Sequence, residues 1–137
     1  MTAVRDRVAS MRDAWASTLV ELGAEDPRTL VLDADLASST KAQLFAEAHP
    51  ERFLQMGIAE QNMVGVAAGL ATSGFVPWVS SFGVFFSNRA LDPIRMLVAQ
   101  THANVKIAAG YTGSASAWRA RPTTTTRTSR RSAPCRE

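Results

Sequence analysis

The run Met56-Gly-Ile-Ala-Glu-Gln-Asn-Met-Val-Gly-Val-Ala-Ala-Gly-Leu-Ala71 carries the strongest structural signal in this chain. It places one carboxylate, Glu60, before fourteen residues without any charge, which extend to Gly74. An apolar segment so rich in glycine and alanine predicts a helix that is buried on several sides. A lone carboxylate at the start of such a helix either caps the helix or handles a proton in a functional site. The spacing alone leaves both interpretations open.

The segments on either side of this helix predict a parallel α/β sheet with helices on both faces. Strands are predicted at 29–32, 53–56, 75–79 and 104–109, and further helices at 4–23, 38–48 and 83–100. Strands that alternate with helices form parallel sheets with right-handed crossovers. Ligands on such sheets bind at the carboxyl ends of the strands, which is where Asp35, Glu60 and Phe82 fall.

Two prolines interrupt this pattern. Pro77 lacks a backbone donor, so it predicts an edge position or an irregular ladder for the strand at 75–79. Pro93 removes a hydrogen bond from the helix at 83–100, and we therefore expect a kink near Ala90 or a break into two helices. Arg89 and Arg95 on this helix could pair with carboxylates or face a partner.

Composition limits the classes to which the protein can belong. A chain of 137 residues with 46% hydrophobic content forms one domain with a substantial core. No apolar stretch reaches the length of a membrane span, and the N-terminal residues lack the apolar core of a signal peptide. The single cysteine, Cys135, suits a reducing compartment. We therefore expect a cytoplasmic protein without a membrane segment. No residues have metal-ligand spacing, so no metal site is expected in this chain.

The order and spacing of three segments resemble a known domain. LVLDADLASST, GIAEQNMVGVAAGLA and SSFGVFFSNRALDPIR are similar to the pyrimidine-binding domain of transketolase-like thiamine diphosphate enzymes. The resemblance runs from about residue 11 to residue 113 and points most to the separate C-terminal subunit of split transketolases. Deoxyxylulose-phosphate synthases and the beta subunits of 2-oxo acid dehydrogenases share this domain, and they remain alternatives.

This resemblance implies the residues of a site. Glu60 would be catalytic, because a buried glutamate in the family hydrogen-bonds N1′ of the aminopyrimidine ring and makes the 4′-amino group basic. Phe82 and Phe85 would flank that ring, with core packing as the alternative for each. Asp35 would lie near the cofactor, unless it caps the helix after the first strand. The cofactor-binding positions implied are Asp35, Gly57, Ile58, Glu60, Phe82 and Phe85.

The resemblance also implies a partner. In the family, the diphosphate and Mg²⁺ bind to another domain with a GDG…N signature, and this sequence contains no such signature. The chain would therefore share thiamine diphosphate with an N-terminal transketolase-type subunit, which would hold the Mg²⁺. The expected function is transfer of a two-carbon ketol unit between sugar phosphates by a hetero-oligomer, and we expect no activity from this chain alone.

The chain changes character after residue 113. Residues 1–113 hold nine Lys or Arg against eleven Asp or Glu, a net charge of −2, whereas residues 114–137 hold six Arg and one Glu, a net charge of +5. We assign 1–113 to a partial pyrimidine-binding domain, and we expect 114–137 to be a disordered basic tail. A shift of one base, with suitable codons, converts this tail to GATHHDDEDIAPLRALPG, which follows a family pattern of the type DGATHxxxEDIA.

The tail therefore suggests a frameshift, and with it a sheet that is incomplete at its C-terminal side. An arginine-rich tail can also contact nucleic acid, but the frame interpretation argues against that function. A non-catalytic fragment that only binds a partner is the alternative from a different functional class.

Overall fold

The computed structural model describes residues 10–112 of the chain. The first part of the predicted helix 4–23 and the predicted tail 114–137 lie outside these residues. Four parallel strands form one sheet with the order β2-β1-β3-β4, which confirms the predicted fold class. The strands are β1 (Thr29–Asp33), β2 (Phe53–Gln55), β3 (Val76–Phe82) and β4 (Lys106–Gly110).

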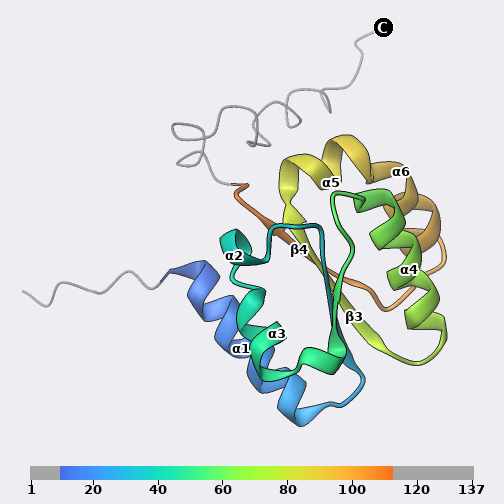
Figure 1. Ribbon diagram of the computed structural model, residues 1–137. Helices are drawn as coiled ribbons and strands as arrows, with labels where there is room; N and C mark the ends of the chain where they lie inside the picture. Colours follow the sequence, from blue (N-terminus) through green and yellow to red (C-terminus); the bar gives the residue numbers. More distant parts are fainter. Residues whose placement is uncertain (1–9, 113–137) are drawn as a thin grey trace, which may run out of the picture.

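Helices cover both faces of this sheet (Figure 1). On one face lie α1 (Met11–Glu25), α2 (Ala37–Thr40), α3 (Gln43–Ala48) and the 3₁₀ turn η1 (Pro50–Arg52). On the other face lie α4 (Glu60–Thr72), α5 (Gly83–Arg89), α6 (Leu91–Pro93) and the π-helical segment η2 (Ile94–Ala99). The chain thus winds to one face after β1 and to the other after β2 and β3. Parallel sheets bind ligands at such a switch point, here between the carboxyl ends of β1 and β3.

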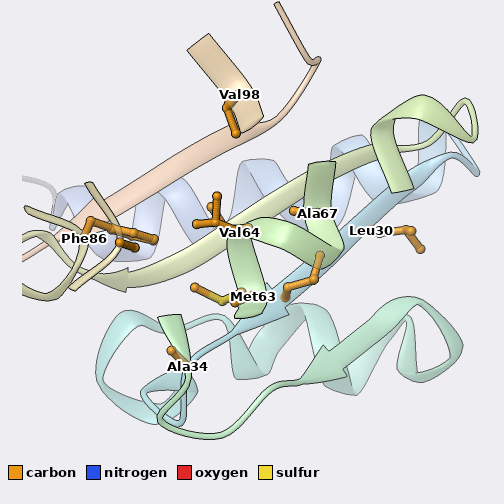
Figure 2. Packing of buried hydrophobic residues seen from close by; sticks show 10 residues of the cluster. Leu30, Ala34, Met63, Val64, Ala67, Phe86 and Val98 are labelled. Atoms are coloured by element: carbon orange, nitrogen blue, oxygen red, sulfur yellow. The ribbon is translucent and has the colours of Figure 1, made fainter. Parts of the chain in front are cut away.

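The pleat of the strands divides the core into two clusters. Leu30, Leu32 and Val79 point to the face that α4 covers, where they pack against side chains of α4, α5 and η2 (Figure 2). Val31 points to the opposite face and packs with Leu19 of α1 and Phe45 of α3. The alternation follows from the two-residue period of a strand. The cluster under α4 supports the helix that begins with Glu60.

Of the two alternatives expected for Pro77, an edge position or an irregular ladder, the edge position is wrong. β3 is central, and Pro77 pairs with Leu30 of β1 in a buried position. The amide of Val76 donates to Arg28 O on the β1 side, so the nitrogen of the next residue faces β4. Pairing with β4 begins only at Trp78. The proline is tolerated because its missing donor falls just before the β4 ladder starts.

Two predicted helices are divided. The helix expected at 38–48 is two short helices, because Lys41 adopts a left-handed conformation with φ of 72° between them. The helix expected at 83–100 breaks at Ala90, whose φ and ψ are −114° and 9°. This second break confirms the expectation that Pro93 divides the helix near Ala90. The chain passes from α5 to the short α6, which ends at Pro93, and then to the π-helical segment η2.

Candidate functional site

The burial of Glu60 follows from its position on α4. The buried residues of this helix are Glu60, Met63, Val64 and Ala67, which recur at three- and four-residue spacing and form one stripe against the sheet. Glu60 is the first member of that stripe, and only 2% of it is exposed. The next two residues, Gln61 and Asn62, are exposed. The helix is therefore buried along one face within the described residues, and the expectation of burial on several sides is wrong for them.

A tight turn brings the chain from β2 into this helix. Gly57 has a φ of +67°, a conformation that a residue with a Cβ atom adopts only at a cost. The amide of Ala59 donates to Gly57 O at 2.8 Å, which closes the turn around Ile58. Ile58 points outward and is 71% exposed. The turn thus fixes Glu60 at the mouth of the helix and presents an apolar side chain beside it.

The carboxylate of Glu60 binds Arg89. Arg89 Nη1 donates to Glu60 Oε1 at 3.0 Å and to Oε2 at 3.2 Å. Ala59, the N-cap residue of α4, makes no side-chain capping bond, and the carboxylate bonds a side chain of α5 instead. The carboxylate lies at the positive end of the helix and bonds Arg89, and both interpretations of Glu60 stay open.

Aromatic rings gather beside this ion pair. The Arg89 guanidinium carbon lies 4.2 Å from the centroid of the Phe85 ring. Phe85 in turn stacks with Phe82, with centroids 5.8 Å apart and planes 14° from parallel. The ring of Tyr111 also packs against Phe82, with centroids 4.3 Å apart. Phe86 enters the core under α4, and Phe82 is also buried, whereas Phe85 is half-buried. Phe85 is therefore the more accessible ring of the predicted aromatic wall.

A second link between α4 and α5 uses the backbone. Gln61 Nε2 donates to the carbonyl oxygen of Arg89 at 2.8 Å. In a continuous α-helix, that carbonyl would accept from the amide of residue 93, which is a proline. Sequence reasoning did not assign a role to Gln61 and left the partner of Arg89 open. The signal was present, because a proline at 93 frees one carbonyl that needs a donor.

Asp35 lies on the other side of the switch point. It is exposed and has a φ of 64°. Its amide and that of Gly57 both donate to Gln55 Oε1, at 3.0 and 3.2 Å. The alternative of a helix cap is wrong, because α2 follows Leu36 without any side-chain capping bond. Gln55 therefore joins two of the predicted cofactor-binding positions.

Asp33 serves the turn after β1. It is fully buried, and its Oδ1 accepts a hydrogen bond of 2.6 Å from the amide of Leu36. Thr40 Oγ1 adds a longer contact of 3.4 Å to Oδ2. Burial raises the pKa of this carboxyl above its ordinary value, and the bond from the Leu36 amide opposes that shift.

The described contacts thus collect the predicted residues into two groups. Glu60, Phe82 and Phe85 form one continuous group, which Arg89 joins. Asp35 and Gly57 form the second group, because the side chain of Gln55 accepts a hydrogen bond from the amide of each. Ile58 lies in the turn between this group and Glu60. The members of both groups lie at or just beyond the carboxyl ends of β1, β2 and β3, except Arg89, which is the last residue of α5.

A hollow in the described part of the chain lies away from Glu60. It has a volume of about 620 Å³ and lies between the start of α1 and β4, where Met11, Trp15, Ala108 and Tyr111 line it. Its lining does not include Glu60. Within residues 10–112, no group of three His, Cys, Asp or Glu side chains could hold a metal ion. In the same range, no helix combines the length and apolar character that a bilayer crossing requires.

Comparison with known proteins places this geometry in a family. The model of the transketolase pyrimidine-binding domain matches residues 7–117. A putative transketolase C-terminal section from Methanocaldococcus jannaschii is 52% identical over 103 residues, which are 75% of this chain and 33% of that protein. Human transketolase is 40% identical over 111 residues, which are 80% of this chain and 17% of that protein.

A solved structure is also similar. A split-gene transketolase, described as an inactive beta4 tetramer, matches with a TM-score of 0.68 and 55% identity. The match covers 77% of this chain and 35% of that one. The chain thus spans about a third or less of the length of these relatives.

Proposed function

Because the chain belongs to the transketolase pyrimidine-binding domain family, we propose that it forms the aminopyrimidine-binding half of a transketolase active site. The observation that carries this proposal is the position of Glu60. Its carboxylate is 2% exposed, lies at the start of α4, and bonds Arg89, whose guanidinium lies over the ring of the half-buried Phe85. A buried acid beside an aromatic face is suited to a flat heterocycle with ring nitrogens.

The residues fit the cofactor that transketolases generally use, thiamine diphosphate. Glu60 would hold a proton at a ring nitrogen of the aminopyrimidine, and its burial excludes water that would compete for that bond. Phe85 and Phe82 would orient the ring by stacking, which contributes about 0.5–1.5 kcal/mol beyond burial. Asp35, Gly57 and Ile58 would line the approach from β1 and β2.

The cofactor, when bound, supplies the carbanion chemistry that transfers a two-carbon unit between sugar phosphates. We propose that a separate N-terminal subunit supplies the diphosphate and Mg²⁺ site, so that the active enzyme is a hetero-oligomer. This proposal of a partner subunit is supported by the similarity of the chain to a transketolase C-terminal section and to a split-gene transketolase. A cytoplasmic location, based on composition, is part of the same proposal.

The proposal is tested by reconstitution. The full chain is expressed together with the subunit that carries the diphosphate-binding half, and ketol transfer between sugar phosphates is measured. We expect Glu60→Gln to lower kcat by about 10²–10⁴, because the charged acid is lost while its shape remains. Glu47→Gln is the matched control, since Glu47 is an exposed carboxylate of α3. Equal activity of the wild type and Glu60→Gln would overturn the assignment.

The same experiment separates the alternatives. Turnover of pyruvate rather than ketose phosphates would identify a deoxyxylulose-phosphate synthase or a 2-oxo acid dehydrogenase subunit. Salt-sensitive binding to DNA that disappears when residues 114–137 are deleted, without any ketol transfer, would identify a non-catalytic binding fragment.

A further inference from the structure

We propose that Arg89 is an internal substitute for the aminopyrimidine ring. In the free chain, the Arg89 side chain bonds Glu60 and covers Phe85, and it must move away when the ring binds. This inference rests on the proposed function. It adds a residue that tunes the affinity of the site and that composition and spacing left without a role.

The contacts of Arg89 are those that a bound ring would need. A guanidinium is flat, positively charged and rich in N–H donors. Its Nη1 bonds both oxygens of Glu60, at 3.0 and 3.2 Å, and its Cζ lies 4.2 Å from the Phe85 centroid. An aminopyrimidine that carries a proton on its ring nitrogen is also flat, cationic and a donor. Both groups therefore compete for the same carboxylate and the same aromatic face.

The side chain of Arg89 can leave without disturbing the helix. It is 45% exposed, whereas Glu60 on the other side of the ion pair is 2% exposed. The backbone of Arg89 is held independently, because its carbonyl accepts from Gln61 and the next amide, that of Ala90, donates to Phe86 O. The motion required is thus a change of side-chain rotamer into solvent.

This competition reduces the affinity for the ring. Before the ring can bind, the bonds between Arg89 and a buried carboxylate must break, and bonds to charged groups are among the stronger ones in proteins. In exchange, Arg89 keeps the acid paired while the site is empty, since an unpaired buried charge is costly. The affinity of the empty site is therefore lower than that of a site without Arg89.

The experiment uses thiamine as the probe, because thiamine carries the aminopyrimidine without the diphosphate that the partner would hold. Calorimetric titration of the full chain gives the Kd for the wild type, Arg89→Gln and Arg95→Gln. We expect Arg89→Gln to bind thiamine about five- to tenfold more tightly. The reason is that thiamine no longer has to break the charge-assisted bonds between the half-exposed Arg89 and Glu60. Arg95→Gln is the matched control, since Arg95 is an exposed arginine further along the same segment, and its Kd should stay unchanged.

A spectroscopic measurement follows the displaced side chain itself. In ¹⁵N spectra of the arginine side chains, the Arg89 signal should differ from that of a free guanidinium in the empty wild type. Addition of thiamine should move the signal to the free position. A third variant, Glu60→Gln, should move it there without thiamine, and circular dichroism verifies that each variant is folded.

The outcomes separate this inference from the proposed function. If thiamine binds the wild type and binding is weakened in Glu60→Gln, the proposed function stands. If Arg89→Gln then binds thiamine no more tightly than the wild type, the substitute role is overturned. If neither the wild type nor Arg89→Gln binds thiamine, the proposed function fails and this inference fails with it.

Discussion

Gln61 Nε2 donates a 2.8 Å hydrogen bond to the carbonyl oxygen of Arg89, the carbonyl that Pro93 leaves without a helical donor. The residue after the proposed catalytic acid thus holds the backbone of the residue that pairs with that acid. One helix start and one helix break are joined twice, by a side-chain pair and by a backbone contact. Both contacts connect the start of α4 to the end of α5.

Removal of the Gln61 side chain should loosen this link. We expect Gln61→Ala to lower the free energy of unfolding by about 1 kcal/mol, the net worth of a typical hydrogen bond. Asn62→Ala is the control, because Asn62 is the neighbouring exposed amide of the same helix turn. Urea denaturation of both variants measures the difference, and equal losses would show that the contact contributes nothing.

The same mutation should matter less when the proline is removed. In Pro93→Ala, a new amide at residue 93 competes for the Arg89 carbonyl, so the loss from Gln61→Ala should shrink. A double-mutant cycle measures this coupling. Strictly additive losses would contradict the assignment of that carbonyl as the shared acceptor.

Two glycines of the same region should respond to alanine in opposite directions. Gly57 has a φ of +67°, and Gly57→Ala should destabilise the chain by about 1 kcal/mol. Gly69 lies within α4 with open space around its position, and Gly69→Ala should stabilise by about 0.5–1 kcal/mol. Chemical denaturation tests both, and a change of the same sign in the two variants would refute the conformational argument.

Stability should depend on the protonation of Asp33. Burial raises the pKa of this carboxyl, so its contribution to stability is fully present below the ordinary pKa of an aspartate and is lost as the pH rises through the raised value. We therefore expect Asp33→Asn, which stays neutral, to raise Tm relative to the wild type at pH 7. The gain should shrink toward pH 4. Thermal melts at pH 7 and pH 4 measure this difference in Tm. A difference that grows as the pH falls would contradict the raised pKa of Asp33.

The nucleotide sequence tests the proposed division at residue 113. We expect reads across codons 105–137 to show that a shift of one base continues the frame into a GATHH…EDIA pattern. Residues 114–137 lie outside the described structure, so this test is independent of it. One uninterrupted frame through codon 137, with no such pattern in the neighbouring frames, would remove the frameshift hypothesis.

Most of the fold could be predicted because its signals are local. The apolar strands, their alternation with helices and the break at Pro93 depend on residues close together in the sequence. The interior position of Pro77 could not be predicted. A proline is tolerated there because of where the ladder with β4 begins, and β4 lies almost thirty residues later in the chain. Similarly, the left-handed Lys41 that divides α2 from α3 follows no glycine or proline signal.

The site shows the same division. Glu60 could be singled out because one carboxylate precedes an uncharged helix, and the family resemblance added the aromatic residues. Its pairing with Arg89 could not be chosen over the Arg95 alternative, since both arginines lie on the same predicted helix. The choice depends on the break at Ala90, which changes the direction of the chain between them.

The ion pair between Glu60 and Arg89 spans 29 residues, and the two belong to helices that flank the central strand β3. The pair can form only after β3 has joined β1 and both helices have settled on the same face. Contacts of such sequence separation form slowly compared with local helix turns. We therefore expect the pair to assemble after these packing steps and not with the local helix turns, so that the Arg89 signal also reports when the native packing has formed.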